Sequence, residues 1–170
     1  AVSRYRRLEG PVIGTAGTLQ TIPSLALLGF MIPFFGIGEV PSIIALFLYS
    51  LLPIIRNTHA GIVSVDQSVI EAASGMGMTE TQILFRIQLP LAFPVMMAGI
   101  RTSTVINVGT ATLAAFIGAG GLGEFIFLGI SRSMDALVLI GAVPAALLAL
   151  LLDFVLGRLQ RLVTPKGLKR

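Results

Sequence analysis

Short polar or glycine-rich intervals divide the chain into four strongly apolar stretches, at 11–34, 41–56, 92–116 and 134–159. A helix needs about 20 mainly apolar residues to cross a membrane, so each stretch predicts one span. The second stretch is short for a span and could continue past Arg56. The pattern predicts an all-α, polytopic transmembrane helical bundle that forms one domain over residues 1–170.

Prolines and glycines modify these expected spans. Pro23 and Pro33 predict a kink or a break near the far end of the first span, and Pro144 predicts an interruption of the fourth. The third span carries small residues such as Gly99, which allow helix backbones to approach closely. The connection at 119–131 is expected to be irregular or partly re-entrant.

The longest polar-rich interval, at 57–90, predicts a loop with its own structure. The sequences Ser64–Gln67 and Thr79–Gln82 both match a capping box, in which a hydroxyl and an amide side chain satisfy backbone groups at the start of a helix. Gly77 lies between them and favours a bend. Pro90 is expected to end the second helix, because proline disfavours helix at the residue before it. The interval therefore predicts two short helices joined at a glycine.

Composition places the chain in a membrane. It has 170 residues, of which 55% are hydrophobic and 12% charged, with a mean hydropathy of +0.93. Soluble domains carry about 25% charged residues. The net charge of +4 does not indicate nucleic-acid binding, because the basic residues cluster at the ends of the apolar stretches. Cysteine is absent, which excludes disulfides and thiolate metal sites and leaves the redox compartment open.

Basic residues also predict the orientation. They precede the first span, flank the 57–90 interval and follow the last span: Arg4, Arg6, Arg7, Arg56, Arg86 and the cluster 158–170. With four spans these regions all fall on one side, and only Arg132 falls on the other. Basic residues favour the cytoplasmic side, so the 57–90 loop is expected to be cytoplasmic.

The loop also carries a recognisable pattern. It resembles the cytoplasmic signature of the membrane subunits of ATP-binding-cassette (ABC) importers, through Glu71, Ala72, Ala73, Gly77, Ile87, Leu89 and Pro90. Two flanking segments, 20–30 and 99–123, resemble the osmoprotectant permeases for glycine betaine, carnitine and choline. The match covers most of the chain.

The resemblance implies a type I importer permease in the bacterial inner membrane. Its expected partners are ABC ATPase subunits, a second permease subunit (identical or related) and an extracytoplasmic solute-binding protein. In that family the loop docks on the ATPase as a coupling helix. Glu71 would then offer an acceptor, Ala72 and Ala73 a flat face, and Gly77 a close approach or a bend. ATP and Mg²⁺ would be bound by the partner, with no cofactor and no catalysis in this chain. The first residues resemble a loop after a preceding span, so a further N-terminal span is expected.

Two sequence features have weak functional interpretations. Residues 118–123 match G-x-G-x-x-G, but they follow an expected membrane helix, where a dinucleotide site requires a strand. A tight turn packed between helices, near an outer gate, is the better interpretation. No phosphate-binding loop with a following lysine occurs, so energy must come from a partner. His59 is the only histidine, and a solvated loop residue is expected rather than a metal ligand or catalytic base.

Polar residues within the expected spans are further candidates. Arg101 and Asp153 should lie at similar depth, which predicts either an ion pair between the third and fourth spans or two side chains that reach the interface separately. Four polar residues of the third span could line a pathway or bond between helices: Ser103, Thr104, Asn107 and Thr110. The sequence shows no aromatic cage for a quaternary ammonium group, since it has no Trp and its two Tyr are scattered.

Two alternatives to a compatible-solute permease remain open. A related importer for amino acids such as methionine would share the loop pattern. A passive channel or structural membrane subunit would predict flux without ATP, and it would leave the 71–90 pattern unexplained.

Overall fold

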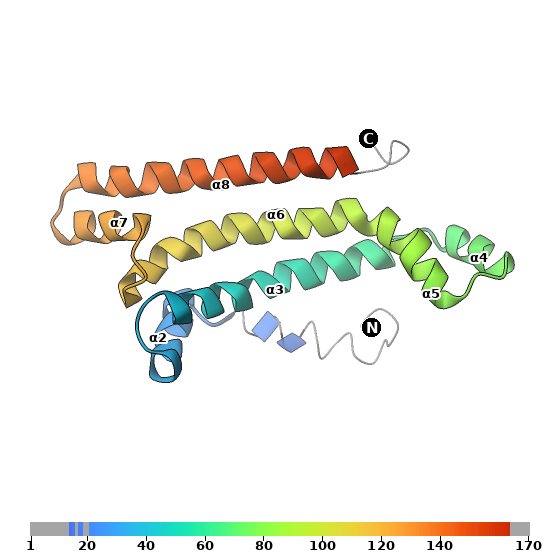
Figure 1. The fold of residues 1–170 in the computed structure, drawn as a ribbon, viewed down its shortest axis with the longest axis horizontal. Helices are drawn as coiled ribbons and strands as arrows, with labels where there is room; N and C mark the ends of the chain where they lie inside the picture. Colours follow the sequence, from blue (N-terminus) through green and yellow to red (C-terminus); the bar gives the residue numbers. More distant parts are fainter. Residues whose placement is uncertain (1–13, 16, 19–20, 164–170) are drawn as a thin grey trace.

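The computed structural model describes residues 14–15, 17–18 and 21–163, and this part of the chain is helical with short connections (Figure 1). In chain order the elements are α2 (Ser24–Phe35), α3 (Glu39–Val63), α4 (Gln67–Gly75), α5 (Glu80–Ile83), the π-helical η1 (Leu84–Gln88), α6 (Leu89–Leu113), the 3₁₀-helical η2 (Ala114–Ile117), α7 (Leu122–Ser131) and α8 (Asp135–Val163).

Three long helices form the body of the structure. Helix α6 lies between α3 and α8, with α4 and α5 at one end and α2, η2 and α7 at the other (Figure 1). Within the described residues, three helices are long and apolar enough to cross a membrane: α3 with 25 residues, the continuous helix Glu80–Ile117 with 38, and Asp135–Leu162 with 28. The second, third and fourth predicted spans correspond to these helices.

The first predicted span, at 11–34, lies partly outside the described residues, and its described part is not one continuous helix. Ile22 and Pro23 are not helical, and α2 begins only after Pro23 and runs for 12 residues. Pro33 lies inside α2 without ending it, and α2 stops at Gly36, whose φ of 80° ends the helical path. The predicted break therefore occurs at the first proline rather than near the far end.

Other predicted boundaries need correction. Helix α3 continues past Arg56 to Val63, so the loop is shorter than 57–90. Helix α8 runs through Pro144 without interruption. The 119–131 connection was expected to be irregular or partly re-entrant; only its first residues are irregular, because α7 occupies Leu122–Ser131. In membrane helices the carbonyl freed by a proline can be satisfied by neighbouring groups, so proline alone does not break them.

Glycine brings α3 and α6 together. A Cβ built on Gly99 would lie 2.6 Å from the Cβ of Asn57 and 2.8 Å from the carbonyl oxygen of Pro53. A Cβ on Gly61 would lie 3.0 Å from the carbonyl oxygen of Ala92. Gly99 therefore leaves no room for a side chain at the crossing and Gly61 leaves little, which is typical of small residues where membrane helices approach closely.

A small hydrophobic core lies at the end of the bundle that is distant from α4 and α5. It joins α2, α3 and η2 through Leu27, Leu28, Ala45, Tyr49, Ala114 and Ile117. The Tyr49 hydroxyl donates a hydrogen bond to the carbonyl oxygen of Ile22, next to Pro23, where the helix is interrupted. This bond ties α3 to the residues that precede α2.

Candidate functional site

The loop between α3 and α6 starts with a cap that differs from the predicted one. Asp66 is the N-cap of α4, and its carboxylate accepts a 2.9 Å hydrogen bond from the backbone N–H of Ser68. This bond, with a further one from the Ser68 side chain, lowers the pKa of Asp66. Ser64 instead ends α3, where its hydroxyl donates to the carbonyl oxygen of Gly61 at 2.9 Å. The predicted Ser64 capping box is therefore wrong.

The bend between α4 and α5 is built as the sequence predicted. Gly77 has a φ of 81°, a conformation that L-residues with a side chain adopt at a cost. No atom lies within 4 Å of a Cβ built there, so within this chain Gly77 serves the bend rather than a close approach. After it the Thr79 capping box is complete. The backbone N–H of Gln82 donates to the Thr79 hydroxyl oxygen at 3.3 Å, and the backbone N–H of Thr79 donates to Gln82 Oε1 at 2.9 Å.

Helices α4 and α5 and the bend between them, here called the hairpin, have a mainly polar surface with several exposed apolar side chains. Glu71 and Ala72 are exposed, whereas Ala73 is 1% exposed and turned inward. Of the two alanines expected to form a flat face, only Ala72 is therefore available at the surface. Met76 is 75% exposed at the bend, Val69 is 39% exposed on α4 and Phe85 is 63% exposed on η1. Large exposed apolar side chains are typical of contact surfaces, and sequence reasoning did not select these as contact residues.

The hairpin continues into the membrane helix without a break. In η1 the amide of Leu89 bonds to the carbonyl oxygen of Leu84, five residues back, which widens the turn just before Pro90. The chain then continues through Pro90 into α6 as one helix. The prediction that Pro90 ends the helix is therefore wrong. Of the other signature residues, Ile87 and Leu89 are half-buried on this continuous helix.

The structure places Arg101 and Asp153 in contact. Arg101 Nε and Nη2 each donate to a different carboxylate oxygen of Asp153, both at 2.8 Å. Arg101 Nη1 also donates to Gln160 Oε1 at 3.2 Å, and Gln160 Nε2 donates to the carbonyl oxygen of Pro94 at 2.9 Å. A Cβ on Gly157 would lie 3.3 Å from the guanidinium carbon, so the guanidinium lies close against the backbone of α8.

This network joins α6 to α8. Asp153, Gly157 and Gln160 occupy positions i, i+4 and i+7, which lie on one face of a helix. Sequence reasoning considered the charged pair but missed Gln160 and Gly157, although this spacing was readable from the sequence.

The polar residues of the third span differ in their hydrogen bonds. Ser103 is buried and donates to the carbonyl oxygen of Ser50 on α3 at 3.2 Å, so it serves as an interhelical bond. Thr104 and Thr110 donate to carbonyls one turn back in their own helix. Within the described chain, the side-chain oxygen of Asn107 is buried without a hydrogen-bond partner. Asn107 is thus the member of the set with unused bonding capacity.

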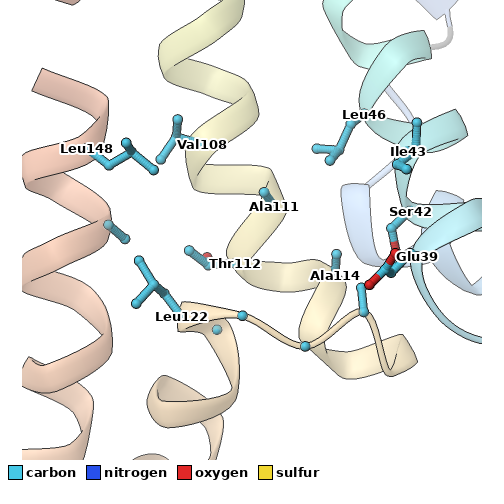
Figure 2. Close-up of a pocket in the computed structure, with 15 residues that line it drawn as sticks. Glu39, Ser42, Ile43, Leu46, Val108, Ala111, Thr112, Ala114, Leu122 and Leu148 are labelled. Carbon is cyan, nitrogen blue, oxygen red and sulfur yellow. The ribbon is translucent and has the colours of Figure 1, made fainter. Parts of the chain in front are cut away.

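A cavity of about 430 Å³ opens at the end of the bundle opposite the hairpin. Side chains of α3, α6 and α8 converge on it, among them Leu46, Val108 and Leu148 (Figure 2). Its polar lining includes Glu39 and Ser42 at the start of α3. The lining is otherwise mainly aliphatic, which suits a small apolar or weakly polar molecule.

The glycine-rich segment 118–123 forms part of this cavity wall. Gly118, Gly120 and Gly121 have φ values of 75°, 73° and 82°, and a Cβ on Gly123 would lie 2.0 Å from the carbonyl oxygen of Thr112. The segment is therefore a tight turn packed against α6, as its position after a membrane helix indicated. His59, expected in a solvated loop, lies half-buried in the last third of α3.

Comparison with known proteins decides the family. Residues 1–167 match the family described as "Binding-protein-dependent transport system inner membrane component". The chain belongs to this family. It is therefore an inner-membrane component of an ABC transport system, and the predicted all-α transmembrane fold and membrane location are confirmed.

Curated relatives cover nearly all of the chain. It is 49% identical over 169 residues to the "Glycine betaine/carnitine/choline transport system permease protein OpuCB" of Bacillus subtilis (strain 168), covering 99% of this chain and 78% of that protein. It is 48% identical to the "Osmoprotectant import permease protein OsmW" of Salmonella typhimurium, covering 99% of this chain and 80% of that protein.

A solved structure shares the fold. The chain superimposes on a chain of the MetNI methionine ABC transporter, in an inward-facing conformation, with a TM-score of 0.83 and 26% identity. The alignment covers 95% of this chain and 78% of that one.

Proposed function

We propose that this chain is the transmembrane permease subunit of an ATP-driven importer for compatible solutes of the quaternary ammonium type, such as glycine betaine, carnitine or choline. The observation that carries the proposal is the near 50% identity, over 99% of the chain, to permeases named for these solutes. Identity to the methionine transporter is 26%, which favours a compatible solute over an amino acid.

The hairpin at α4 and α5 is the proposed contact with the ATPase. Its exposed Glu71, Ala72 and Met76 would meet the partner, and Gly77 would set the angle between the two short helices. Because α5, η1 and α6 are one continuous helix, a displacement of the hairpin would tilt α6 directly. ATP-driven closure of the ATPase pair would thereby favour one of two arrangements of the spans, and the loss of nucleotide would favour the other.

The remaining partners follow from the same proposal. A second permease subunit would complete the translocation pathway, with Asn107 as its candidate polar residue in α6 and Ser103, Thr104 and Thr110 supporting the helix. A solute-binding protein would deliver the solute at the end of the bundle opposite the hairpin. ATP and Mg²⁺ would be bound by the ATPase subunits.

Purification and uptake test this function together. The full-length protein, extracted from its native membrane in mild detergent, should carry an ATP-binding subunit. The complex reconstituted in vesicles with its binding protein should take up radiolabelled glycine betaine, carnitine or choline only when ATP is supplied. Competition by methionine alone would favour the amino-acid alternative. Solute flux without ATP and without a co-purifying ATPase would identify a passive channel and refute the proposal.

A further inference from the structure

Three phenylalanine side chains and one carboxylate line a hollow beside α7. Its volume is about 650 Å³, and its lining includes Phe116 from η2 and Glu124, Phe125 and Phe127 from α7. The expectation of no aromatic cage considered only Trp and Tyr and so missed these phenylalanines, which come from two elements separated by the glycine turn. We call this hollow the α7 cavity.

The glycine turn brings the aromatic residues together. Positive φ angles at Gly118, Gly120 and Gly121 reverse the chain after η2, and the close packing of Gly123 on α6 holds α7 in place. The rings of Phe116 and Phe127 lie against each other with 56° between their planes. The hollow is therefore built by backbone geometry that few sequences other than a glycine-rich one could adopt.

Two of the three phenylalanines are not buried by the rest of the described chain. Phe116 is 58% exposed and Phe125 is 43% exposed. The cavity in Figure 2, by contrast, is lined by aliphatic side chains and glycines with Glu39, and it has no aromatic lining. The two hollows therefore differ in the chemistry that they offer.

A quaternary ammonium group suits the α7 cavity. It has a diffuse positive charge and no N–H to donate, and it is recognised by aromatic faces. Glu124 supplies the opposite charge, and the residues that line the cavity include no Lys or Arg. The segments at this end of the described chain contribute three carboxylates, Glu39, Glu124 and Asp135, against one arginine, Arg132. The local charge balance thus favours a cation over an anion.

We infer that the α7 cavity is a transient binding site for the trimethylammonium group of the solute, on the side where the solute is delivered. The inference rests on the proposed function for its solute class. Phe116, Phe125 and Phe127 would contact the methyl groups, and Glu124 would compensate the charge. The site would hold the solute briefly between its release from the binding protein and its entry between the spans.

Conservative substitutions in the complete importer test the site. Phe125→Leu keeps an apolar side chain but removes the aromatic face, whereas Phe125→Trp retains it. Phe47→Leu is the matched control, because Phe47 is 62% exposed on α3, outside the cavity. For each reconstituted importer we would measure the apparent KM for choline uptake. We would also measure binding of choline, and of its neutral isostere 3,3-dimethylbutanol, to the permease–ATPase assembly without binding protein, by saturation-transfer NMR.

Loss of one ring should raise the apparent KM for choline about two- to five-fold and weaken its direct binding by a similar factor. Phe125→Trp and Phe47→Leu should stay near wild type, Glu124→Gln should weaken binding as Phe125→Leu does, and the neutral isostere should not compete. If Phe125→Leu matches wild type, or if the isostere binds as well as choline, the hollow is a lipid or subunit contact and the inference fails. If the wild-type importer takes up no quaternary solute, the proposed function itself fails.

Discussion

Substitution of Gly99 by alanine should separate α3 from α6, and Gly109 provides a control in the same helix. The added methyl at Gly99 would lie 2.6 Å from the Asn57 Cβ and 2.8 Å from the Pro53 carbonyl oxygen. The second atom belongs to the backbone, so a change of side-chain rotamer cannot relieve the contact. A Cβ built on Gly109 has no atom within 4 Å in this chain.

The expected cost can be worked from these distances. Non-bonded carbon atoms are most stable at about 3.5–4.0 Å, so the two helices must separate by roughly 1 Å or distort locally. Overpacking of this kind costs about 1–3 kcal/mol. Alanine is favoured over glycine in a helix by up to about 1 kcal/mol, but that gain applies equally to both variants and cancels in their comparison. Gly99→Ala should therefore be about 1–3 kcal/mol less stable than Gly109→Ala.

Thermal inactivation of the detergent-solubilised complex measures this difference. For a chain of this size, 1 kcal/mol shifts Tm by about 2–4 °C, so the two variants should differ by about 2–12 °C in the temperature at which half of the protein stays monodisperse. ATP-driven uptake should fall in Gly99→Ala and persist in Gly109→Ala. Equal thermal stability of the two variants would refute the close α3–α6 crossing.

Three further predictions concern the coupling hairpin and the ion pair. Gly77→Asp should leave the protein in the membrane but abolish co-purification of the ATPase and solute uptake, because it places a side chain and a charge at a positive φ. The control Gly75→Asp adds the same charge within a helix and should retain more ATPase binding and uptake than Gly77→Asp. Transport by Gly77→Asp equal to that of the wild type would exclude the proposed role. Arg101→Ala and Asp153→Ala should each lower thermal stability, since each leaves an unpaired charge within a span. The double variant Arg101→Asp with Asp153→Arg, which exchanges the two charges, should recover part of that stability. Absence of any recovery would argue against the ion pair. The pKa of Asp66 is lowered in the folded protein, so its contribution to stability as an N-cap should be complete above the pKa of the unfolded chain, about 3.9, and should be lost as pH falls through the folded pKa. Hydrogen exchange of the α4 amides should therefore increase over that acidic range in the wild type but not in Asp66→Asn. An identical pH response of the two proteins would contradict the cap.

Features that depend on local sequence were predictable, and those that depend on where a neighbouring element ends were not. The Thr79 capping box and the bend at Gly77 require only residues within one turn of the chain, and both are present as predicted. Ser64 and Asp66 both have suitable cap side chains, and the choice between them depends on α3 extending to Val63. That extension is decided by packing of α3 on α6, which local sequence does not report.

The structural consequences of Pro90 and of the phenylalanines were likewise not predictable from local sequence. Pro90 was expected to end a helix, but a π turn lies just before it and the helix continues through Pro90 into α6. The α7 cavity depends on a chain reversal between Phe116 and Phe125, and no periodicity in the sequence places those rings together. The sequence therefore predicted which residues are unusual more reliably than which of them meet.

The continuous helix Glu80–Ile117 gives the proposed coupling a mechanical basis. Close packing at Gly99 fixes α3 to one side of it, and the network of Arg101, Asp153 and Gln160 fixes α8 to another. Both contacts are made by α6, which follows the hairpin and η1 in the chain. Since α3 and α8 are both attached to α6, the three helices are expected to move as one body when the hairpin tilts this continuous helix. A hairpin displacement would then reach the α7 cavity through rigid helices rather than through a chain of small side-chain changes.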